Sequence, residues 1–199
     1  MNHKKAAFPN LLVVIGASAG GLEPIRQIIS HLPESFQATV IVATHRNPAE
    51  TQNRLAEILS HDARLKVREP VEGESLDCTT LYVGRPSSSL RIDGRIAHLD
   101  DVASHLERLQ RIDELFLSAA RYAGENAVGV ILSGTLSDGV EGLKAIHAAG
   151  GKCIVQDPAD AIFDDMPQNA LNDVPVDYVA TPVGIAGILI ELAAERSCQ

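Results

Sequence analysis

Residues 11–22 read LLVVIGASAGGL, an apolar run that ends at a glycine and passes through a serine into a helix-like segment. The run suits a strand buried on both faces of a parallel sheet, and the turn after such a strand lies at the carboxyl edge of the sheet, where ligands bind. Gly16 and Gly20 remove side chains that would crowd the turn, as in the Gly-x-Ser-x-Gly nucleophile elbow. Ser18 is therefore a candidate nucleophile.

Two other interpretations of Ser18 need the same residue types. A glycine-rich turn before a helix can cradle a phosphate, with Ser18 as one more hydrogen-bond donor. A serine at this position can also cap the first turn of the helix. The five-residue pattern by itself leaves all three interpretations open.

The composition is that of a soluble globular domain. The chain has 199 residues, of which 45% are hydrophobic and 22% charged, enough for one domain with a substantial core. A net charge of −9 argues against binding to nucleic acid, which requires a clustered basic surface. The cysteines, Cys78, Cys153 and Cys198, are far apart and lack metal-ligand spacing, so the sequence predicts free thiols in a reducing compartment and no cysteine-bound metal.

Targeting signals are not evident in the sequence. Glu23 and Arg26 interrupt the first apolar stretch too early for a signal peptide, and no segment approaches the roughly 18 apolar residues of a membrane span. The sequence therefore predicts a cytoplasmic protein without membrane insertion. We expect residues 1–10 to be poorly ordered and residues 11–195 to form a single domain.

Strand-like and helix-like segments alternate along most of the chain. Continuous apolar runs predict strands at residues 11–15, 39–44, 128–132, 152–155 and 177–180. Apolar residues at helical spacing predict helices at residues 22–32, 48–60, 105–123, 139–149 and 182–195. This alternation predicts an α/β fold with a doubly wound, mostly parallel sheet and helices on both faces.

The middle of the chain departs from the alternation. A short strand is expected at residues 67–69, and residues 81–83, 89–92 and 95–99 are expected to form a small antiparallel region. Asp93-Gly94 is a strong hairpin signal between the last two. We expect this hairpin to flank the main sheet and to shape one wall of the crevice at Ser18.

A serine nucleophile needs a base and a residue that orients the base. His45 directly follows the run at 39–44, which places it at the same edge of the sheet as Ser18, although a surface loop histidine would look the same. Asp138 follows the run at 128–132 and a glycine-containing loop, although an aspartate there can also cap the next helix. Asp157 is the second choice for the acid, but before Pro158 it is more simply a turn residue.

Backbone N–H groups would form the oxyanion site. Ala19 is the expected first donor because it follows the nucleophile, and residues 134–136 are the expected source of the second. The order serine, histidine, aspartate differs from the serine, aspartate, histidine order of the α/β-hydrolases. The chain is therefore not expected to adopt that fold.

Six short motifs follow one another along the chain. They are IGASAGG at residues 15–21, TH at 44–45, NAVGVILSG at 126–134, SDG at 137–139, QDP at 156–158 and MPQNA at 166–170. In this order they resemble the catalytic domain of CheB, the bacterial chemotaxis protein-glutamate methylesterase, over about residues 11–192. Each motif is weak alone, but the ordered set is specific.

The resemblance implies a sheet of about seven strands with a triad of Ser18, His45 and Asp138 at its carboxyl edge. It implies hydrolysis of glutamyl γ-methyl esters on a methyl-accepting chemotaxis receptor, and deamidation of certain receptor glutamines by the same acyl chemistry. Neither reaction needs a cofactor. A separate receiver or methyltransferase protein is a further expected partner.

Three features differ from the usual pattern of the family. The elbow begins within the first twenty residues, so the sequence predicts a stand-alone form without the N-terminal receiver domain that restrains catalysis. Thr135 replaces the methionine whose backbone helps to form the oxyanion site. Residues 110–113, QRID, replace the usual Arg-Pro-Ser before the long helix, so substrate contacts are expected to differ. Candidates for such contacts are Arg46, Leu136 and Met166.

Functions of two other classes stay open. A nucleotide-binding module would hold phosphate at residues 16–21, although the P-loop lysine is missing. A catalytically degenerate domain would bind a receptor or signalling partner without hydrolysis, and the change at Thr135 leaves room for this function.

Overall fold

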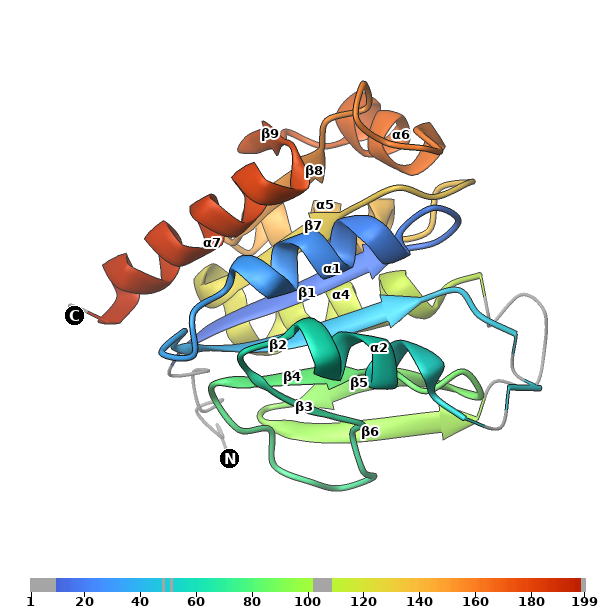
Figure 1. The fold of residues 1–199 in the computed structure, drawn as a ribbon. Helices are drawn as coiled ribbons and strands as arrows, with labels where there is room; N and C mark the ends of the chain where they lie inside the picture. The colour runs from blue at the N-terminus through green and yellow to red at the C-terminus, as the bar shows by residue number, and fades with distance from the viewer. Residues whose placement is uncertain (1–9, 48, 51, 102–108, 198–199) are drawn as a thin grey trace, which may run out of the picture.

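The computed structural model describes residues 10–47, 49–50, 52–101 and 109–197. Seven strands form the main sheet, in the order β3-β4-β2-β1-β7-β8-β9, and every pair of neighbours is parallel; the central strands β1 and β2 lie side by side in Figure 1. A separate antiparallel pair is formed by β5 and β6. The strands are β1 (Leu11–Ala17), β2 (Ala38–Thr44), β3 (Lys66–Arg68), β4 (Thr80–Val83), β5 (Ser88–Asp93), β6 (Ile96–Asp101), β7 (Ala127–Ile131), β8 (Lys152–Gln156) and β9 (Tyr178–Ala180).

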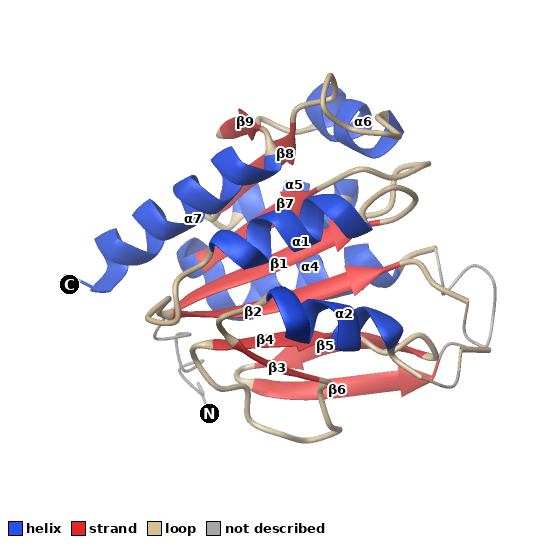
Figure 2. Ribbon diagram, viewed as in Figure 1, coloured by secondary structure: helices blue, strands red, loops and turns tan. Residues whose placement is uncertain are grey.

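Helices cover both faces of the main sheet, and a short 3-10 turn precedes β7 (Figure 2). Helices α1, α2 and α7 lie on one face, whereas α4, α5 and α6 pack on the other. The helical segments are α1 (Leu22–His31), α2 (Arg54–Asp62), α4 (Arg111–Ala123), η1 (Gly124–Asn126), α5 (Val140–Ala148), α6 (Asp165–Asp173) and α7 (Pro182–Ser197). The expected doubly wound α/β fold is therefore confirmed.

The residues of β1 explain why a continuous apolar run forms a central strand. Side chains alternate along a strand, so Leu12 and Val14 face the helices α4 and α5, whereas Val13 and Ile15 face α1, α2 and α7. Both sets are fully buried. Each face therefore has its own aliphatic core, and β1 lies between β2 and β7 with Ser18 just beyond its end.

The prediction for the middle of the chain was partly wrong. The segment expected at residues 81–83 is not antiparallel, because β4 pairs in parallel with both β2 and β3 in the main sheet. The Asp93-Gly94 hairpin does form, and it packs against α4, where the Ser118 hydroxyl accepts a hydrogen bond from the Ile92 N–H at 3.1 Å. The groove that the hairpin lines with α4 is separate from Ser18, so the hairpin does not shape that pocket.

Two helix boundaries also differ from the prediction. Helix α2 begins at Arg54 and not at residue 48, because the Asn53 side chain caps it by accepting the Ala56 N–H at 3.3 Å. Helix α4 begins at Arg111, and the part expected at 105–108 lies outside the described residues. Helix α6 was missed by the sequence analysis.

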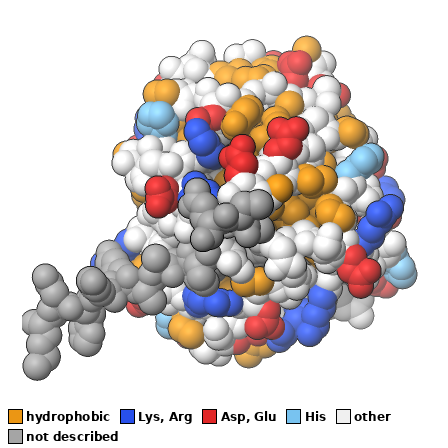
Figure 3. All heavy atoms as spheres, turned by 90° about the vertical axis from the view of Figure 1, so that its left-hand side faces the viewer, with side chains coloured by type: hydrophobic (Ala, Val, Ile, Leu, Met, Phe, Trp, Pro, Cys, Tyr) orange, Lys and Arg blue, Asp and Glu red, His pale blue; other side chains and the backbone are white. Residues whose placement is uncertain are grey.

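The expectation for residues 1–10 can be compared with the structure only at Asn10, because residues 1–9 lie outside the described part. The Asn10 side chain donates to the sulfur of Cys78. Figure 3 views the edge at which the strands of the main sheet begin, where acidic, basic and apolar side chains are interspersed. Within the described residues, no helix is both long and apolar enough to span a membrane.

Candidate active site at the carboxyl edge of the sheet

A tight turn places Ser18 between β1 and α1. The Ser18 N–H donates to the Ser133 carbonyl at 3.0 Å, and the Ser18 carbonyl accepts the Gly21 N–H at 3.0 Å. Gly20 has φ +73°, and a Cβ at this position would lie 2.8 Å from the Ser133 hydroxyl and 3.0 Å from Ile162 Cβ. Only glycine fits both the left-handed backbone and this crowding, which explains the glycine of the motif.

Three side chains from three segments form a hydrogen-bonded chain. His45 Nδ1 lies 3.1 Å from Ser18 Oγ, and His45 Nε2 lies 2.6 Å from Asp138 Oδ2. Ser18 follows β1, His45 follows β2, and Asp138 lies in the loop between β7 and α5. Because β2, β1 and β7 are neighbours in the parallel sheet, their carboxyl ends bring these residues together.

The arrangement assigns a tautomer to His45. Both Asp138 Oδ atoms accept hydrogen bonds, so His45 carries its proton on Nε2, and the Nδ1 lone pair faces the Ser18 hydroxyl. Turning the ring over would set carbon atoms against both partners, so it offers no alternative. The His45 side chain is 16% exposed and that of Asp138 2% exposed, so another molecule can reach His45 from solvent but not Asp138.

Backbone N–H groups at the start of helix α4 also hold the Asp138 carboxylate. Asp138 Oδ2 accepts the Ile112 N–H at 3.0 Å, and Oδ1 accepts the Asp113 N–H at 2.9 Å. Gln110, the N-cap residue of α4, makes no side-chain cap bond, so Asp138 supplies the cap from another part of the chain. The N-terminus of α4 stabilises this negative charge, and the sequence carried no local signal for the contact.

Asp113, in the first turn of α4, caps the next helix in return. Its Oδ1 atom accepts the Gly142 N–H of α5 at 2.7 Å. Burial raises the pKa of the Asp113 carboxyl to about 6, and the nearby charge of Asp138 adds to this shift. A second titratable carboxyl therefore lies directly behind Asp138.

Arg111 has a structural role that the sequence analysis did not foresee. Its buried guanidinium donates to the Thr44 carbonyl at 3.1 Å and to the Pro86 carbonyl at 3.0 Å. Thr44 precedes His45, so this contact ties the end of β2 to the start of α4. Residues 110–113, for which altered substrate contacts are expected, thus include a side chain that holds the backbone of the site.

Ser133 connects the elbow to the loops on the far side of the site. Its hydroxyl donates to the Ala19 carbonyl at 2.9 Å and accepts the Phe163 N–H at 3.0 Å, and the side chain is fully buried. Its N–H donates to Gln156 Oε1 at 2.9 Å. The motif NAVGVILSG contains Ser133, but its position in the motif did not indicate this role.

The loop after β7 approaches Ser18 closely. A Cβ at Gly134 would lie 2.8 Å from Ser18 Cβ and 2.1 Å from Met166 Sδ. The Gly134 N–H is already bonded to the Phe163 carbonyl at 3.0 Å, whereas the N–H groups of Ala19 and Thr135 donate to no group among the residues that the structure describes. The Leu136 N–H is likewise unbonded among these residues, so Ala19, Thr135 and Leu136 are the expected donors that stay available.

The three candidates for substrate contacts lie in different environments. Leu136 is 56% exposed and has φ +71°, and its carbonyl accepts Asn169 Nδ2 at 2.7 Å. Arg46 is half-buried and donates to Asn53 Oδ1 and to the Gly84 carbonyl. Met166 is fully buried, so it supports the loop at Gly134 and has no exposed surface for a substrate.

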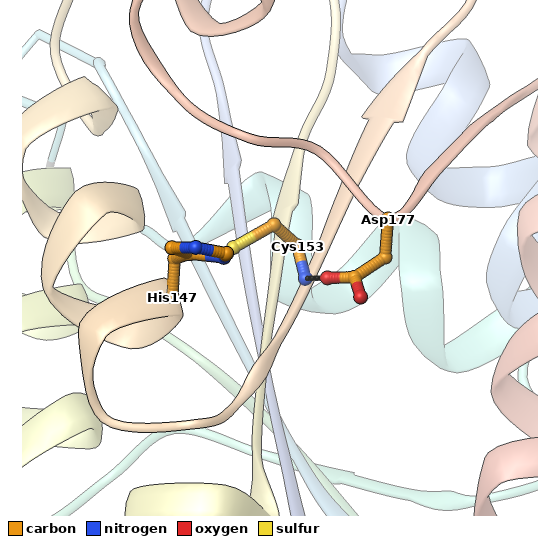
Figure 4. Close-up of side chains that lie close together, drawn as sticks. All are labelled: His147, Cys153 and Asp177. Atoms are coloured by element: carbon orange, nitrogen blue, oxygen red, sulfur yellow. Dashed lines mark hydrogen bonds between the residues drawn. The ribbon is translucent and has the colours of Figure 1, made fainter.

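A cluster of ligand-type side chains lies elsewhere, at the start of β8. Among the described residues, His147, Cys153 and Asp177 bring one ligand atom each within 4.8 Å of the others. Both Asp177 oxygens are already bonded: Oδ2 accepts the Cys153 N–H at 2.8 Å (Figure 4), and Oδ1 accepts from Lys152 Nζ at 2.8 Å. Burial raises the pKa of the Cys153 thiol to about 12. Because metals bind the thiolate, this shift disfavours metal binding at Cys153. These contacts tie β8 to the loop before β9 and are those of a structural cluster.

The fold and the site together define a class of protein: a doubly wound α/β domain with serine, histidine and aspartate side chains in hydrogen-bonding contact at the carboxyl edge of its sheet. The family model described as CheB methylesterase matches residues 13–189. A crystal structure titled as the Thermotoga maritima CheB methylesterase catalytic domain superposes with a TM-score of 0.83 at 29% identity, over 92% of this chain and 98% of the other.

Curated proteins agree with this match. "Protein-glutamate methylesterase/protein-glutamine glutaminase 1" of Burkholderia pseudomallei is 36% identical over 173 residues, which are 85% of this chain but 47% of that protein. A Leptospira interrogans protein with the same two activities in its name is 33% identical over 90% of this chain and 93% of its own length. The chain belongs to the CheB methylesterase family.

Proposed function

We propose that this chain is a protein-glutamate methylesterase that works through an acyl-enzyme on Ser18. The observation that carries the proposal is the continuous chain of hydrogen bonds from Ser18 through His45 to Asp138. A serine hydroxyl becomes nucleophilic when an adjacent base takes its proton, and the base works when a third group orients it. Family membership supports the same chemistry.

The first half of the reaction forms the acyl-enzyme. His45 Nδ1 takes the Ser18 proton while Oγ attacks the ester carbonyl, and Asp138 stabilises the charge that develops on the ring. The N–H groups of Ala19 and Thr135 bind the oxyanion of the tetrahedral intermediate, a contribution of about 3–4 kcal/mol for each donor. The intermediate then collapses, and His45 returns the proton to the departing methoxide, which leaves as methanol.

The second half of the reaction frees the enzyme. A water molecule gives a proton to His45 Nδ1 and attacks the acyl carbonyl. Collapse of this second intermediate releases the glutamate carboxylate and returns the proton to Ser18 Oγ. A glutamine side chain would follow the same steps with ammonia as the leaving group, which would give the glutaminase activity named for the relatives.

We further propose that the substrate is a methyl-accepting chemotaxis receptor, or a similar protein that is methylated on glutamate. The names of the relatives support a protein substrate. The partly exposed His45 and the open pocket that Ser18 and His45 line support it as well, because a side chain on another protein can reach Ser18 from solvent.

The hydrogen bonds of the turn disfavour a nucleotide as the ligand. Two N–H groups that a phosphate cradle would use, those of Ser18 and Gly21, are bonded to the carbonyls of Ser133 and Ser18, which leaves fewer donors for a phosphate. The intact contacts of His45 with both partners likewise favour a working hydrolase over a degenerate binding domain.

The test is methanol release from a methylated receptor fragment, compared between the wild-type chain and Ser18→Ala. We expect methanol from the wild type alone, and labelling of Ser18 by a serine-reactive phosphonate. Equal methanol release from folded Ser18→Ala protein, or no release and no labelling in the wild type, would refute the proposal.

A further inference from the structure

A pocket opens directly beside Ser18, between helices α1 and α2. Ser18, Thr44 and His45 line it at the sheet, and its walls are the apolar side chains of α1 and α2. These wall residues are Leu22, Ile25, Leu55 and Ile58. The pocket holds about 210 Å³, below the roughly 300 Å³ at which pockets for drug-sized ligands begin. It therefore suits one side chain adjacent to the reacting group and is too small for a nucleotide.

The pocket carries more positive than negative charge. Arg46, Arg54 and Glu50 line it, so two guanidinium groups face one carboxylate. Arg46 is committed to Asn53 and to the Gly84 carbonyl, and Glu50 stabilises its charge. This local excess stands out in a chain with a net charge of −9.

Arg54 is the donor in the pocket that remains available. It is the first residue of α2 and is exposed, and its guanidinium has no hydrogen bond or ion pair to any residue that the structure describes. An arginine fork matches the two oxygens of a carboxylate. The ligand that this arginine fits is therefore an acidic group held at the mouth of the pocket.

Thr44 supplies a second, independent sign of a ligand. Its side chain is 8% exposed, and its hydroxyl is buried without a hydrogen-bond partner among the described residues. Buried polar groups are almost always bonded, so an orphaned hydroxyl in the wall of a pocket marks a place where a ligand or a water completes the bonding. Its burial places it deeper in the pocket than Arg54.

We propose that this pocket binds an acidic side chain of the protein substrate that lies next to the ester-bearing residue. The apolar wall would take the methylene groups of that side chain and Arg54 its carboxylate at the mouth, and the Thr44 hydroxyl would bond a water held beneath it at the base. The proposal rests on the proposed function, which places the ester at Ser18. It makes Arg54 a residue that sets specificity for esters in acidic surroundings.

The experiment uses matched helical peptides that carry one glutamyl γ-methyl ester and have either Glu or Gln at the positions within one helical turn of it. For the wild type we expect kcat/KM about tenfold higher with Glu, the ratio typical of one hydrogen bond to a charged group. Arg54→Gln should bring the ratio close to one, and Arg54→Glu should favour a peptide with Lys at those positions. The wild-type preference should shrink as salt is added.

Arg64 provides the matched control. It is another exposed arginine, beyond the opposite end of α2, and it does not line the pocket. Arg64→Gln should keep both the activity and the Glu preference of the wild type. A loss of the preference in Arg64→Gln equal to that in Arg54→Gln would mean that overall charge and not the pocket sets it, and would overturn the proposal.

The outcomes separate this proposal from the proposed function. Hydrolysis of both peptides at equal rates would sustain the esterase and overturn the acidic pocket. If neither peptide is hydrolysed, the esterase proposal fails on these substrates. Calorimetry with Ser18→Ala then still measures how tightly the pocket binds each peptide. Tighter binding of the Glu peptide that Arg54→Gln abolishes would support the pocket, and equal binding of both peptides would overturn it.

Discussion

Asp138 and Asp113 exchange helix caps across the base of the site. Asp138, in the turn before α5, accepts the Asp113 N–H in the first turn of α4 at 2.9 Å, and Asp113 accepts the Gly142 N–H of α5 at 2.7 Å. Each carboxylate thus fixes the start of the helix next to the other. The acid that orients His45 is held by backbone and cannot swing away unless two helix ends move with it.

This exchange predicts that Asp138→Asn is far more damaging than a change of charge alone. The carboxylate accepts from His45 Nε2 and from the N–H groups of Ile112 and Asp113, so the introduced amide NH2 must face at least one donor. If it faces His45, the ring takes the other tautomer, and Nδ1 can no longer accept the Ser18 proton. We expect kcat to fall by about 10⁴-fold, as in a triad with the wrong tautomer.

Asp157→Asn is the control for this measurement. Asp157 was the alternative acid, but its Oδ1 atom accepts the Ala159 N–H at 2.9 Å within its own turn. Methanol release should therefore stay near the wild-type rate in Asp157→Asn. Comparable losses in the two variants would refute the assignment of the acid to Asp138.

Asp113→Asn tests the buried carboxyl through the pH dependence of stability. Its pKa is raised from 3.8 to about 6 in the folded chain, so the folded state holds this proton over a range in which the unfolded state has lost it. Stability from this group is therefore present below about pH 4 and is lost as the pH rises to about 6. The introduced amide keeps an acceptor for Gly142 and does not titrate.

The free energy of unfolding of Asp113→Asn should therefore increase relative to that of the wild type between about pH 4 and pH 6, and this increase should persist at neutral pH. Denaturant unfolding at a series of pH values measures this difference. Parallel curves for the two proteins would contradict it. Asp113→Ala does not titrate either, but it removes the cap of α5, so its free energy of unfolding should lie about 1 kcal/mol below that of Asp113→Asn over the whole range.

Much of the site followed from the sequence because the catalytic candidates directly follow strands. Ser18, His45 and Asp138 each come after an apolar run, and parallel strands end at one edge, so their convergence could be predicted without coordinates. The role of Asp113 could not, since it depends on the contact of two helices whose capped residues are 29 positions apart. Which ring nitrogen of His45 faces Ser18 likewise depends on the path of the loops.

The errors in the prediction of the fold have similar causes. Pairing of β4 with β2 joins residues about forty positions apart, and a four-residue strand carries little pattern of its own. Helix α6 is short, polar and contains Pro167, so neither its periodicity nor its composition indicated a helix. The sequence offers two signals for the start of α2, a proline at residue 48 that suits a first turn and an N-cap at Asn53. In the structure α2 starts after the Asn53 cap.

The tautomer of His45 is itself a prediction. In trypsin-like proteases Nε2 faces the serine, whereas here Nδ1 lies 3.1 Å from Ser18 Oγ and Nε2 faces Asp138. Nitrogen NMR of the ring should show a protonated Nε2 and an unprotonated Nδ1 when the ring is neutral, and Ser18→Ala should shift mainly the Nδ1 signal. His45→Gln assigns the signals by removing them, and a neutral ring protonated on Nδ1 would contradict the geometry.

Arg111→Met should weaken both the fold and the reaction. The change leaves the buried carbonyls of Thr44 and Pro86 without this donor, at a cost of about 1–3 kcal/mol. Thr44 directly precedes His45, so a shift of Thr44 moves the base, and kcat should fall more than KM changes. Arg111→Lys should recover part of the lost kcat, because lysine can donate to one of the two carbonyls. Arg121→Met changes an exposed arginine on the same helix and should alter neither quantity measurably; unchanged kcat in folded Arg111→Met would contradict the role.

Gly134→Ala tests how closely the loop after β7 must approach the nucleophile. The added methyl group would lie 2.1 Å from Met166 Sδ and 2.8 Å from Ser18 Cβ, so either the loop or the elbow must shift. We expect a loss of about 1–3 kcal/mol of stability from overpacking, and a fall of about 10²-fold in kcat if the reacting groups move by about 1 Å.

Gly187→Ala is the control, because a methyl group there meets nothing within 4 Å and should add about 0.5–1 kcal/mol to the stability of α7. Full activity in Gly134→Ala would mean that the Thr135 N–H need not lie where the structure has it, and would remove that group from the proposed oxyanion site.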